Sequence, residues 1–295
     1  MTLPTFLGIG VPRAGTTWLH SLLASHPAVY LPTQRKEIRF FDRHYDEGTA
    51  WYERFFCPPQ ERERYRAIGE ISPQYLYDPR CPDRIAELLP DAKLIVMLRH
   101  PVARAYSQYG FVIQRRGYRG SFDAFVASRP RALEMGHYAT YLAAYRRRFE
   151  RDRILLLLFE EAVGEGGNAR GELARFLGIG ADGFGDVADR VNPSTVPRFR
   201  GLSSFAVRTG RRLRRHHLEP LVDLAGRLGV RRFLTSGGRI PRLDPEVKVR
   251  LSERYEADFE ELERSWDLDL TSWRATPASG GRPDLQVPER GERAS

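Results

Sequence analysis

Residues 10–17 combine glycines, an arginine and threonines in an order that suits the binding of a phosphate-like anion. Gly10 and Gly15 flank a turn between an apolar run and a helix-like pattern, with Arg13 inside the turn. Glycines let the backbone approach an anion closely, and the first turn of a helix offers unpaired N–H groups. The glycines have Walker A spacing, but Thr16 stands where that motif requires lysine. A nucleotide kinase or NTPase is therefore disfavoured, whereas phosphate or phosphosulfate binding is not; the alternative is a glycine turn with helix-capping threonines.

A second candidate anion site is formed by Arg99 and Ser107. Arg99 follows the apolar run 93–98, and Ser107 comes eight residues later in a helix-like pattern. Ligands of open α/β sheets lie beyond the carboxyl ends of the strands, which is where this run would place Arg99. A guanidinium and a hydroxyl can together hold a second phosphate. The alternative is a solvated strand end followed by an ordinary helix residue, and two such sites in one chain make it less favoured.

A third segment, residues 35–42, reads Arg-Lys-Glu-Ile-Arg-Phe-Phe-Asp. If this stretch is extended, alternation places Lys36 and Ile38 on one side and Glu37 and Arg39 on the other. A carboxylate flanked by cations and backed by aromatic rings can be held close to a substrate hydroxyl. Taken alone, the segment is more typical of a solvated strand end.

The elements that must position these residues alternate along the chain. Short apolar runs without polar alternation predict central strands, covered on both faces, and the segments between them have helical spacing. The expected strands are 5–10, 67–71, 93–98 and 154–159, and the expected helices are 16–26, 82–89, 101–115, 138–149, 168–177 and 245–266. This alternation predicts an α/β fold with a central, mostly parallel sheet flanked by helices, plus a helical C-terminal part.

Composition and charge limit the classes of protein. The formal net charge of +9 is concentrated in residues 201–243, which carry ten arginines against two acidic residues. The charge therefore describes one surface and does not predict a nucleic-acid binder. No apolar run has the length of a membrane span, no signal peptide is visible, and two cysteines exclude a disulfide framework or a structural zinc site. We expect a soluble intracellular protein with one domain over residues 1–274 and a disordered tail over 275–295.

Together and in this order, the three segments resemble those of the sulfotransferases that use 3′-phosphoadenosine 5′-phosphosulfate (PAPS). The similarity is greatest to the group that contains the heparan sulfate N- and 3-O-sulfotransferases and many bacterial relatives. The resemblance implies a P-loop-like three-layer fold, PAPS as sulfuryl donor and PAP as product, without a metal. It also implies an acceptor with a hydroxyl, or less commonly an amine, on a glycan, a lipid or a small metabolite.

The resemblance assigns roles to individual residues. Glu37 is the implied general base, and Arg13 stabilises charge on the leaving group. The implied donor-binding residues are Arg13, Ala14, Gly15, Thr16, Thr17, Trp18, Arg99 and Ser107, with Arg198 and Arg200 in a late loop. The implied acceptor-side residues are Lys36, Arg39, Asp42, Glu70 and Tyr75, the last two in a Gly-Glu-Ile-Ser-Pro-Gln-Tyr stretch that resembles the family's Glu-Lys-x-Pro-x-Tyr.

Several positions depart from the heparan-type pattern. Arg13 stands where those enzymes usually have lysine, although the tyrosylprotein sulfotransferases have a similar Pro-Arg-x-Gly-Thr-Thr loop. Ile71 replaces a lysine and Arg39 replaces a common histidine, so the identity of the acceptor does not carry over. Two alternatives stay open: an ATP-dependent small-molecule kinase, and a non-catalytic module that binds a nucleotide or a polyanion.

The basic run 208–215 has two interpretations. The favoured one is a solvated helix face, and the other is a surface that attracts an anionic acceptor or makes a peripheral membrane contact. The absence of an apolar anchor segment favours a bacterial cytoplasmic enzyme over a Golgi enzyme.

Overall fold

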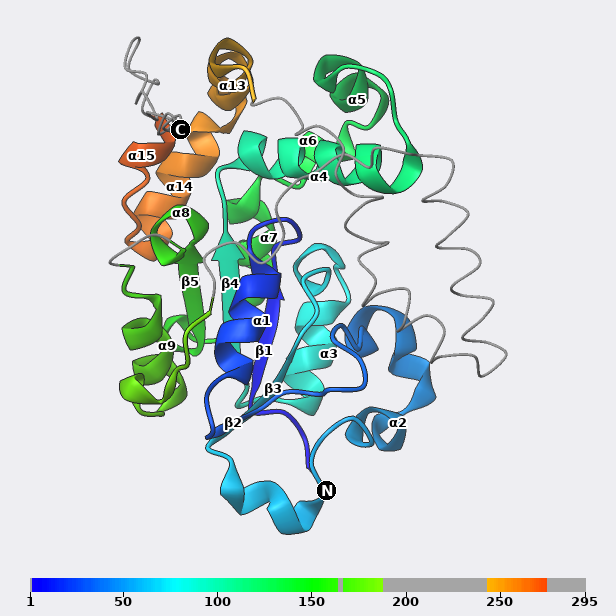
Figure 1. Cartoon of the computed structure of the whole chain (residues 1–295), viewed down its shortest axis with the longest axis vertical. Coiled ribbons are helices and arrows are strands. Elements are labelled where there is room, and N and C mark those ends of the chain that lie inside the picture. The colour runs from blue at the N-terminus through cyan, green and yellow to red at the C-terminus, as the bar shows by residue number, and fades with distance from the viewer. Residues whose placement is uncertain (1, 164–166, 188–242, 275–295) are drawn as a thin grey trace, which may run out of the picture.

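The centre of the fold is a parallel five-stranded sheet in the order β2-β3-β1-β4-β5 (Figure 1). The computed structural model describes residues 2–163, 167–187 and 243–274. The strands are β1 (Phe6–Gly10), β2 (Val29–Tyr30), β3 (Ala67–Ile71), β4 (Lys93–Leu98) and β5 (Ile154–Leu158). The predicted α/β class with a central parallel sheet is therefore confirmed.

The strand order reverses beside β1. From β1 the chain passes to β2 and then β3 on one side, and it then crosses to β4 on the other side. In open parallel sheets, ligands bind beyond the carboxyl ends of the strands at such a switch point. The segments that follow β1 and β4 contain Arg13 and Arg99, so the topology brings the two predicted anion-binding segments to adjacent strand ends.

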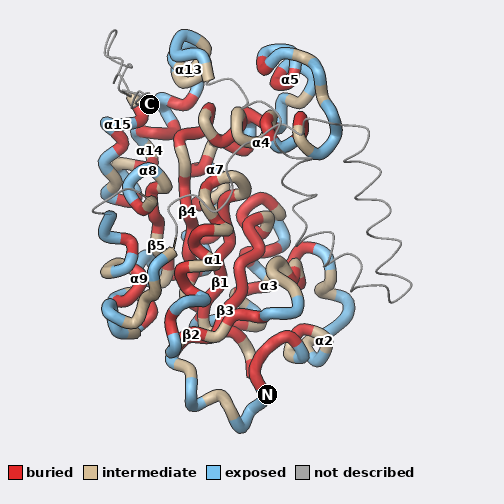
Figure 2. The backbone as a smooth tube through the Cα atoms, viewed as in Figure 1, coloured by how far each residue is buried: buried red, intermediate tan, exposed pale blue. Residues whose placement is uncertain are grey.

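Helices cover both faces of the sheet. Helix α1 (Thr16–Ala24) lies in front of the strands in Figure 1, and α7 (Tyr138–Arg146) lies behind them. Helix α3 (Cys81–Leu88) lies beside α7, because Asp83 of α3 pairs with Arg148 just beyond α7 at 2.5 Å. Figure 2 shows the strands buried along their length and much of the outer helical surface exposed. Burial on both faces explains why the strands lack polar alternation.

The remaining elements connect and extend these layers. Helix α4 (Pro101–Arg116) follows β4 and α9 (Ala169–Leu177) follows β5, both close to the predicted bounds. The short helices α2 (Thr49–Glu53), α5 (Phe122–Ser128), α6 (Arg131–Glu134) and α8 (Phe159–Ala162) were not expected, nor was β2. The single-turn elements are η1 (Phe40–His44), η2 (Tyr45–Glu47), η3 (Pro59–Arg64), η4 (Tyr75–Tyr77), η5 (Arg151–Arg153) and η6 (Ala181–Gly183).

The expected helix over 245–266 is two helices. Helix α13 (Pro245–Ser252) ends at the 3₁₀ turn η7 (Glu253–Tyr255), and α14 (Glu256–Trp266) follows, before the short α15 (Thr271–Arg274). The break lets Tyr255 enter the core, where its hydroxyl donates to the Leu133 carbonyl at 2.7 Å. Helix α13 packs against α4 and α14 against α7, so the C-terminal part is attached to the sheet domain along two helices.

Candidate active site

The loop between β1 and α1 is shaped for a close approach to an anion. Gly15 has a left-handed backbone with φ of 84°, and Arg13 has φ of 74°. A Cβ on Gly15 would lie 2.5 Å from the Phe159 ring and 2.9 Å from the Met97 sulfur, so only glycine fits there. The first turn of α1 then begins at Thr16, with N–H groups that have no partner within the helix. This geometry suits the predicted phosphate loop.

The two predicted anion-binding segments meet in the structure. Arg13 Nε donates to Ser107 Oγ at 3.3 Å, and the Arg13 guanidinium lies 4.9 Å from the centre of the Phe111 ring. Arg99 donates to the Arg13 carbonyl at 3.2 Å and lies over the Phe159 ring. Tyr138 holds the backbone at the same strand end, because its hydroxyl donates to the Arg99 carbonyl at 2.8 Å. Arg13, Arg99 and Ser107 therefore form one cluster, although the sequence separates Arg13 from Ser107 by 94 positions.

The cluster carries an excess of positive charge. Burial lowers the pKa of Arg13, and the neighbouring guanidinium groups of Arg99, Arg104 and Arg115 lower it further. Among the residues that the structure describes, neither Arg13, Arg104 nor Arg115 has a carboxylate within ion-pair distance. The like charges of Arg13, Arg104 and Arg115 repel one another, and a bound polyanion would offset this repulsion.

Lys36 reaches the same loop from the other side. Its Nζ donates to Thr17 Oγ1 at 2.7 Å, in the first turn of α1. Burial lowers the pKa of Lys36, while the adjacent Glu37 raises it. His20, one turn further along α1, also has a lowered pKa, caused by burial and then by the charge of Lys36. The segment with the predicted base therefore contacts the predicted donor loop directly.

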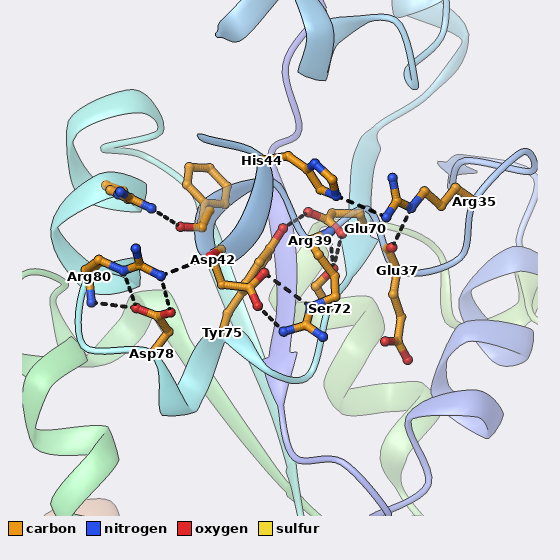
Figure 3. A network of polar contacts seen from close by, with 12 residues as sticks. Arg35, Glu37, Arg39, Asp42, His44, Glu70, Ser72, Tyr75, Asp78 and Arg80 are labelled. Carbon is orange, nitrogen blue, oxygen red and sulfur yellow. Dashed lines mark hydrogen bonds and ion pairs between the residues drawn. The ribbon is translucent and has the colours of Figure 1, made fainter. Parts of the chain in front are cut away.

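The backbone around Glu37 is fixed by the end of β3. The Ile38 amide donates to Glu70 Oε2 at 3.3 Å, and the Arg39 amide donates to Ser72 Oγ at 3.0 Å. Arg35 Nε donates to the Glu37 carbonyl at 3.1 Å. Figure 3 shows the carboxylate of Glu37 pointing away from this network. Glu37 is half-buried. Its carboxylate forms no hydrogen bond or ion pair with the described part of the chain.

Glu70 is the centre of the network in Figure 3. Its side chain is fully buried and accepts from Tyr75 at 2.6 Å, from Ser72 at 2.6 Å and from Tyr52 at 3.1 Å, besides the Ile38 amide. Burial raises the pKa of Glu70, and these donors oppose the rise. Glu70 and Tyr75 therefore lie in the interior, where they position the Glu37 segment. The resemblance implies an acceptor-side role for both residues, and the structure shows that their side chains are buried.

The condition that residues 35–42 are extended does not hold beyond Ile38. Arg39 has a left-handed backbone with φ of 61°, and a π-helical turn begins at Phe40. The turn buries both phenylalanines: Phe40 stacks on Tyr52 with ring centres 4.3 Å apart, and Phe41 packs against Tyr75 at 5.5 Å. Burying two adjacent rings requires the turn, since an extended chain would place them on opposite sides.

Arg39 and Asp42 form an ion pair across this turn. Arg39 Nε donates to Asp42 Oδ1 at 3.3 Å, and a second nitrogen contacts Oδ2. The Arg80 side chain donates to the Asp42 carbonyl at 3.0 Å, which ties the turn to the start of α3. Arg39 is partly exposed and Asp42 is nearly buried, so the pair lies at the edge of the site beside Glu37.

The other predicted residues lie around the loop. Ala14, Thr16 and Trp18 are buried against the sheet, and Thr17 is half-buried. Arg198 and Arg200, the basic run 208–215 and the expected tail 275–295 lie outside the described residues.

The residues that support the arginine cluster were not among the predicted site residues. Phe111 and Arg115 lie four and eight positions after Ser107, on the same face of α4, and Arg13 contacts Phe111. Arg104 is fully buried and donates to Gln108 Oε1 at 3.1 Å. The four-residue spacing after Ser107 is a signal that could have identified Phe111, whereas nothing local to Arg104 indicates its burial.

Within residues 2–163, 167–187 and 243–274, no group of three or more His, Cys, Asp and Glu side chains is arranged to hold a metal ion. None of the helices described over these ranges has both the length and the apolar character to cross a bilayer.

The chain is similar in sequence to known sulfotransferases. The membrane-associated sulfotransferase kil1 of Dictyostelium discoideum is 40% identical over 114 residues, which are 39% of this chain and 24% of that protein. Human heparan sulfate glucosamine 3-O-sulfotransferase 3B1 is 31% identical over 186 residues, which are 60% of this chain and 46% of that protein. The alignments thus span less than half the length of either relative.

A solved structure and a family model match the chain as well. A sulfotransferase from Alicyclobacillus acidocaldarius has a TM-score of 0.67 to this structure at 23% identity, covering 93% of this chain and 100% of that one. At this identity the likeness shows a shared fold. A sequence model of the sulfotransferase domain matches residues 3–262. Since that match covers most of the chain, the protein belongs to the sulfotransferase family.

Proposed function

We propose that this protein transfers a sulfuryl group from PAPS to an acceptor hydroxyl, with Glu37 as the general base. The observation that carries the proposal is the meeting of three segments at the β1–β4 switch point. The phosphate loop and the Arg99–Ser107 segment form one cationic cluster, and Lys36 joins the Glu37 segment to the same loop. An anionic donor held there would lie beside a carboxylate that can accept a proton.

The chain's own residues fit a donor with phosphate groups at two positions. Arg99, Ser107 and Arg13 would hold one phosphate, because their donors converge without a carboxylate paired to Arg13 in the described residues. The loop around Gly15, with Thr16 and Thr17, would hold the other through N–H and hydroxyl groups. When bound, PAPS supplies the activated sulfuryl group. Arginine and lysine side chains bring the positive charge to the site, so we propose no role for a metal.

Glu37 would take the acceptor proton as the new sulfur–oxygen bond forms. A well-placed general base contributes about 10²–10⁴ in rate, provided its position is fixed. The hydrogen bonds from Ile38 to Glu70 and from Arg39 to Ser72 fix the backbone on the C-terminal side of Glu37. Arg39 and Asp42 form the edge of the same segment and are proposed to face the acceptor.

The two rival functions have less support. An ATP-dependent kinase is disfavoured because Thr16 occupies the Walker lysine position and the chain belongs to the sulfotransferase family. A non-catalytic binding module would not need a half-buried carboxylate next to the lysine that contacts the donor loop. The acceptor class stays open among glycans, lipids and small metabolites, since Ile71 and Arg39 depart from the heparan-type pattern.

The experiment compares wild type with Glu37→Gln in a transfer assay with ³⁵S-labelled PAPS and a panel of hydroxyl acceptors. We expect turnover to fall by about 10²–10⁴ while PAP affinity is retained, because the amide keeps the shape of the carboxylate but cannot accept the proton. Glu63→Gln, an exposed position outside the site, is the matched control and should keep wild-type turnover. Wild-type turnover in Glu37→Gln would show that another group is the base.

A further inference from the structure

Lys36 contacts the donor loop, although the sequence pattern had placed it among the acceptor-side residues. Its ammonium donates to Thr17 Oγ1 at 2.7 Å, and Thr17 is the second residue of α1. The first turn of a helix carries a partial positive charge and unpaired N–H groups. Lys36 therefore adds a full positive charge to the part of the loop that is shaped for an anion.

Arg13 points in a different direction. Its guanidinium donates to Ser107 and lies over the Phe111 ring, so it faces α4 and belongs to the cluster with Arg99. The resemblance implies that Arg13 stabilises the charge that develops on the leaving group. Among the described residues, Lys36 is the cationic side chain that donates a hydrogen bond to the first turn of α1.

The charge of Lys36 is not neutralised nearby. In the described part of the chain, no carboxylate lies within ion-pair distance of Nζ, although Glu37 is the next residue and His20 is close on α1. Thr17 accepts one of the three N–H groups of the ammonium, and no other residue of the described ranges accepts from it, which leaves two N–H groups for a ligand. Lys36 and Glu37 are adjacent, which places a cation for the donor next to a carboxylate for the acceptor.

We propose that Lys36 binds the phosphosulfate end of the donor and stabilises the charge that collects on the departing phosphate oxygen. This inference rests on the proposed function. In the transfer, the bond between sulfur and the bridging oxygen breaks and its electron pair stays on the phosphate oxygen. A bond between sulfur and the acceptor oxygen forms, and the acceptor proton passes to Glu37. Lys36 keeps its proton and donates a hydrogen bond to the departing oxygen.

The test measures binding by calorimetry and needs no acceptor. Wild type and Lys36→Met are titrated with PAP and with adenosine 3′-monophosphate, which lacks the 5′-phosphate. We expect Lys36→Met to weaken PAP binding by about 10- to 100-fold, the loss of one charged hydrogen bond, and to leave adenosine 3′-monophosphate binding unchanged within about twofold. Arg43→Met, an exposed position in the same segment, removes an equal charge and should change neither affinity.

Each other outcome has a definite meaning. If Lys36→Met weakened the binding of both ligands equally, the inference would be overturned, because the whole pocket would have been damaged. Lys36→Arg keeps the positive charge and should regain part of the PAP affinity. Unchanged PAP affinity in Lys36→Met would also overturn it and return Lys36 to the acceptor side. Failure of wild type itself to bind PAP would instead refute the proposed function.

Discussion

At the scale of single residues, Gly15 is held in place by its surroundings. We predict that Gly15→Ala destabilises the protein by several kcal/mol and abolishes donor binding, because the new methyl group meets Phe159 and Met97 in a left-handed backbone. Gly178 has the same left-handed conformation with nothing within 4 Å, so Gly178→Ala isolates the backbone cost of about 1 kcal/mol. Urea unfolding of both variants measures the difference, and equal losses would show that the loop accommodates a side chain.

The residue types and their spacing indicated the candidate site residues but not all the contacts among them. Arg13, Arg99 and Ser107 were expected to bind phosphate because of their types and spacing, and the structure brings them together. The contact between Lys36 and Thr17 was not predicted, since it depends on how the chain returns after β2. Such contacts are set by tertiary packing, which local patterns do not encode.

At the scale of elements, β3 positions the Glu37 segment through Glu70. We predict that Glu70→Gln lowers stability by about 1–3 kcal/mol, because the amide N–H₂ would face one of the donors that the carboxylate now accepts. Turnover should fall while PAP affinity changes less, since the donor loop lies on other strands. Tyr52→Phe removes one donor only and should have a smaller effect in the same thermal unfolding and transfer assays. A Glu70→Gln enzyme with wild-type stability and turnover would contradict this role.

The elements differ in how far the sequence reveals them. β1, β3, β4 and β5 were all predicted; β1, β4 and β5 are mainly apolar runs buried on both faces, whereas β3 also contains the buried Glu70. The two-residue β2 is too short to leave a pattern. The turn at Phe40–His44 follows from long-range hydrogen bonds to Glu70 and Ser72, and the break at Glu253–Tyr255 follows from the burial of Tyr255.

At the scale of the whole molecule, His100 joins the C-terminal helices to the end of β4. Its Nε2 lies 3.2 Å from the Trp273 carbonyl and 3.3 Å from Ser252 Oγ. Burial lowers the pKa of His100 to about 3, and the charge of Lys248 also lowers it. The folded protein therefore keeps His100 neutral at pH values where the unfolded chain binds a proton.

Because the unfolded chain protonates His100 more readily than the folded protein does, the free energy of unfolding falls as the pH falls. The ordinary pKa of histidine is about 6.5, and the contribution of His100 to stability is fully present above that pH. As the pH falls from 6.5 toward 3, this contribution is lost at up to about 1.4 kcal/mol per pH unit. We predict that the stability difference between wild type and His100→Asn shrinks between pH 6.5 and 4. Urea unfolding across this range measures it, and a difference that is constant with pH would contradict the neutral, buried state.

The proposed donor is a nucleotide with phosphates at the 3′ and 5′ positions, which sets it apart from ADP and ATP. The most direct measurement is a calorimetric titration of the full chain with PAP, compared with ADP and ATP, each with and without magnesium. We predict tight binding of PAP that does not depend on magnesium, and weak binding of ADP and ATP, because the proposed ligand of Arg99, Ser107 and Arg13 is a 3′-phosphate, which these nucleotides lack. A preference for ATP with magnesium would contradict the assignment of the donor and favour a kinase.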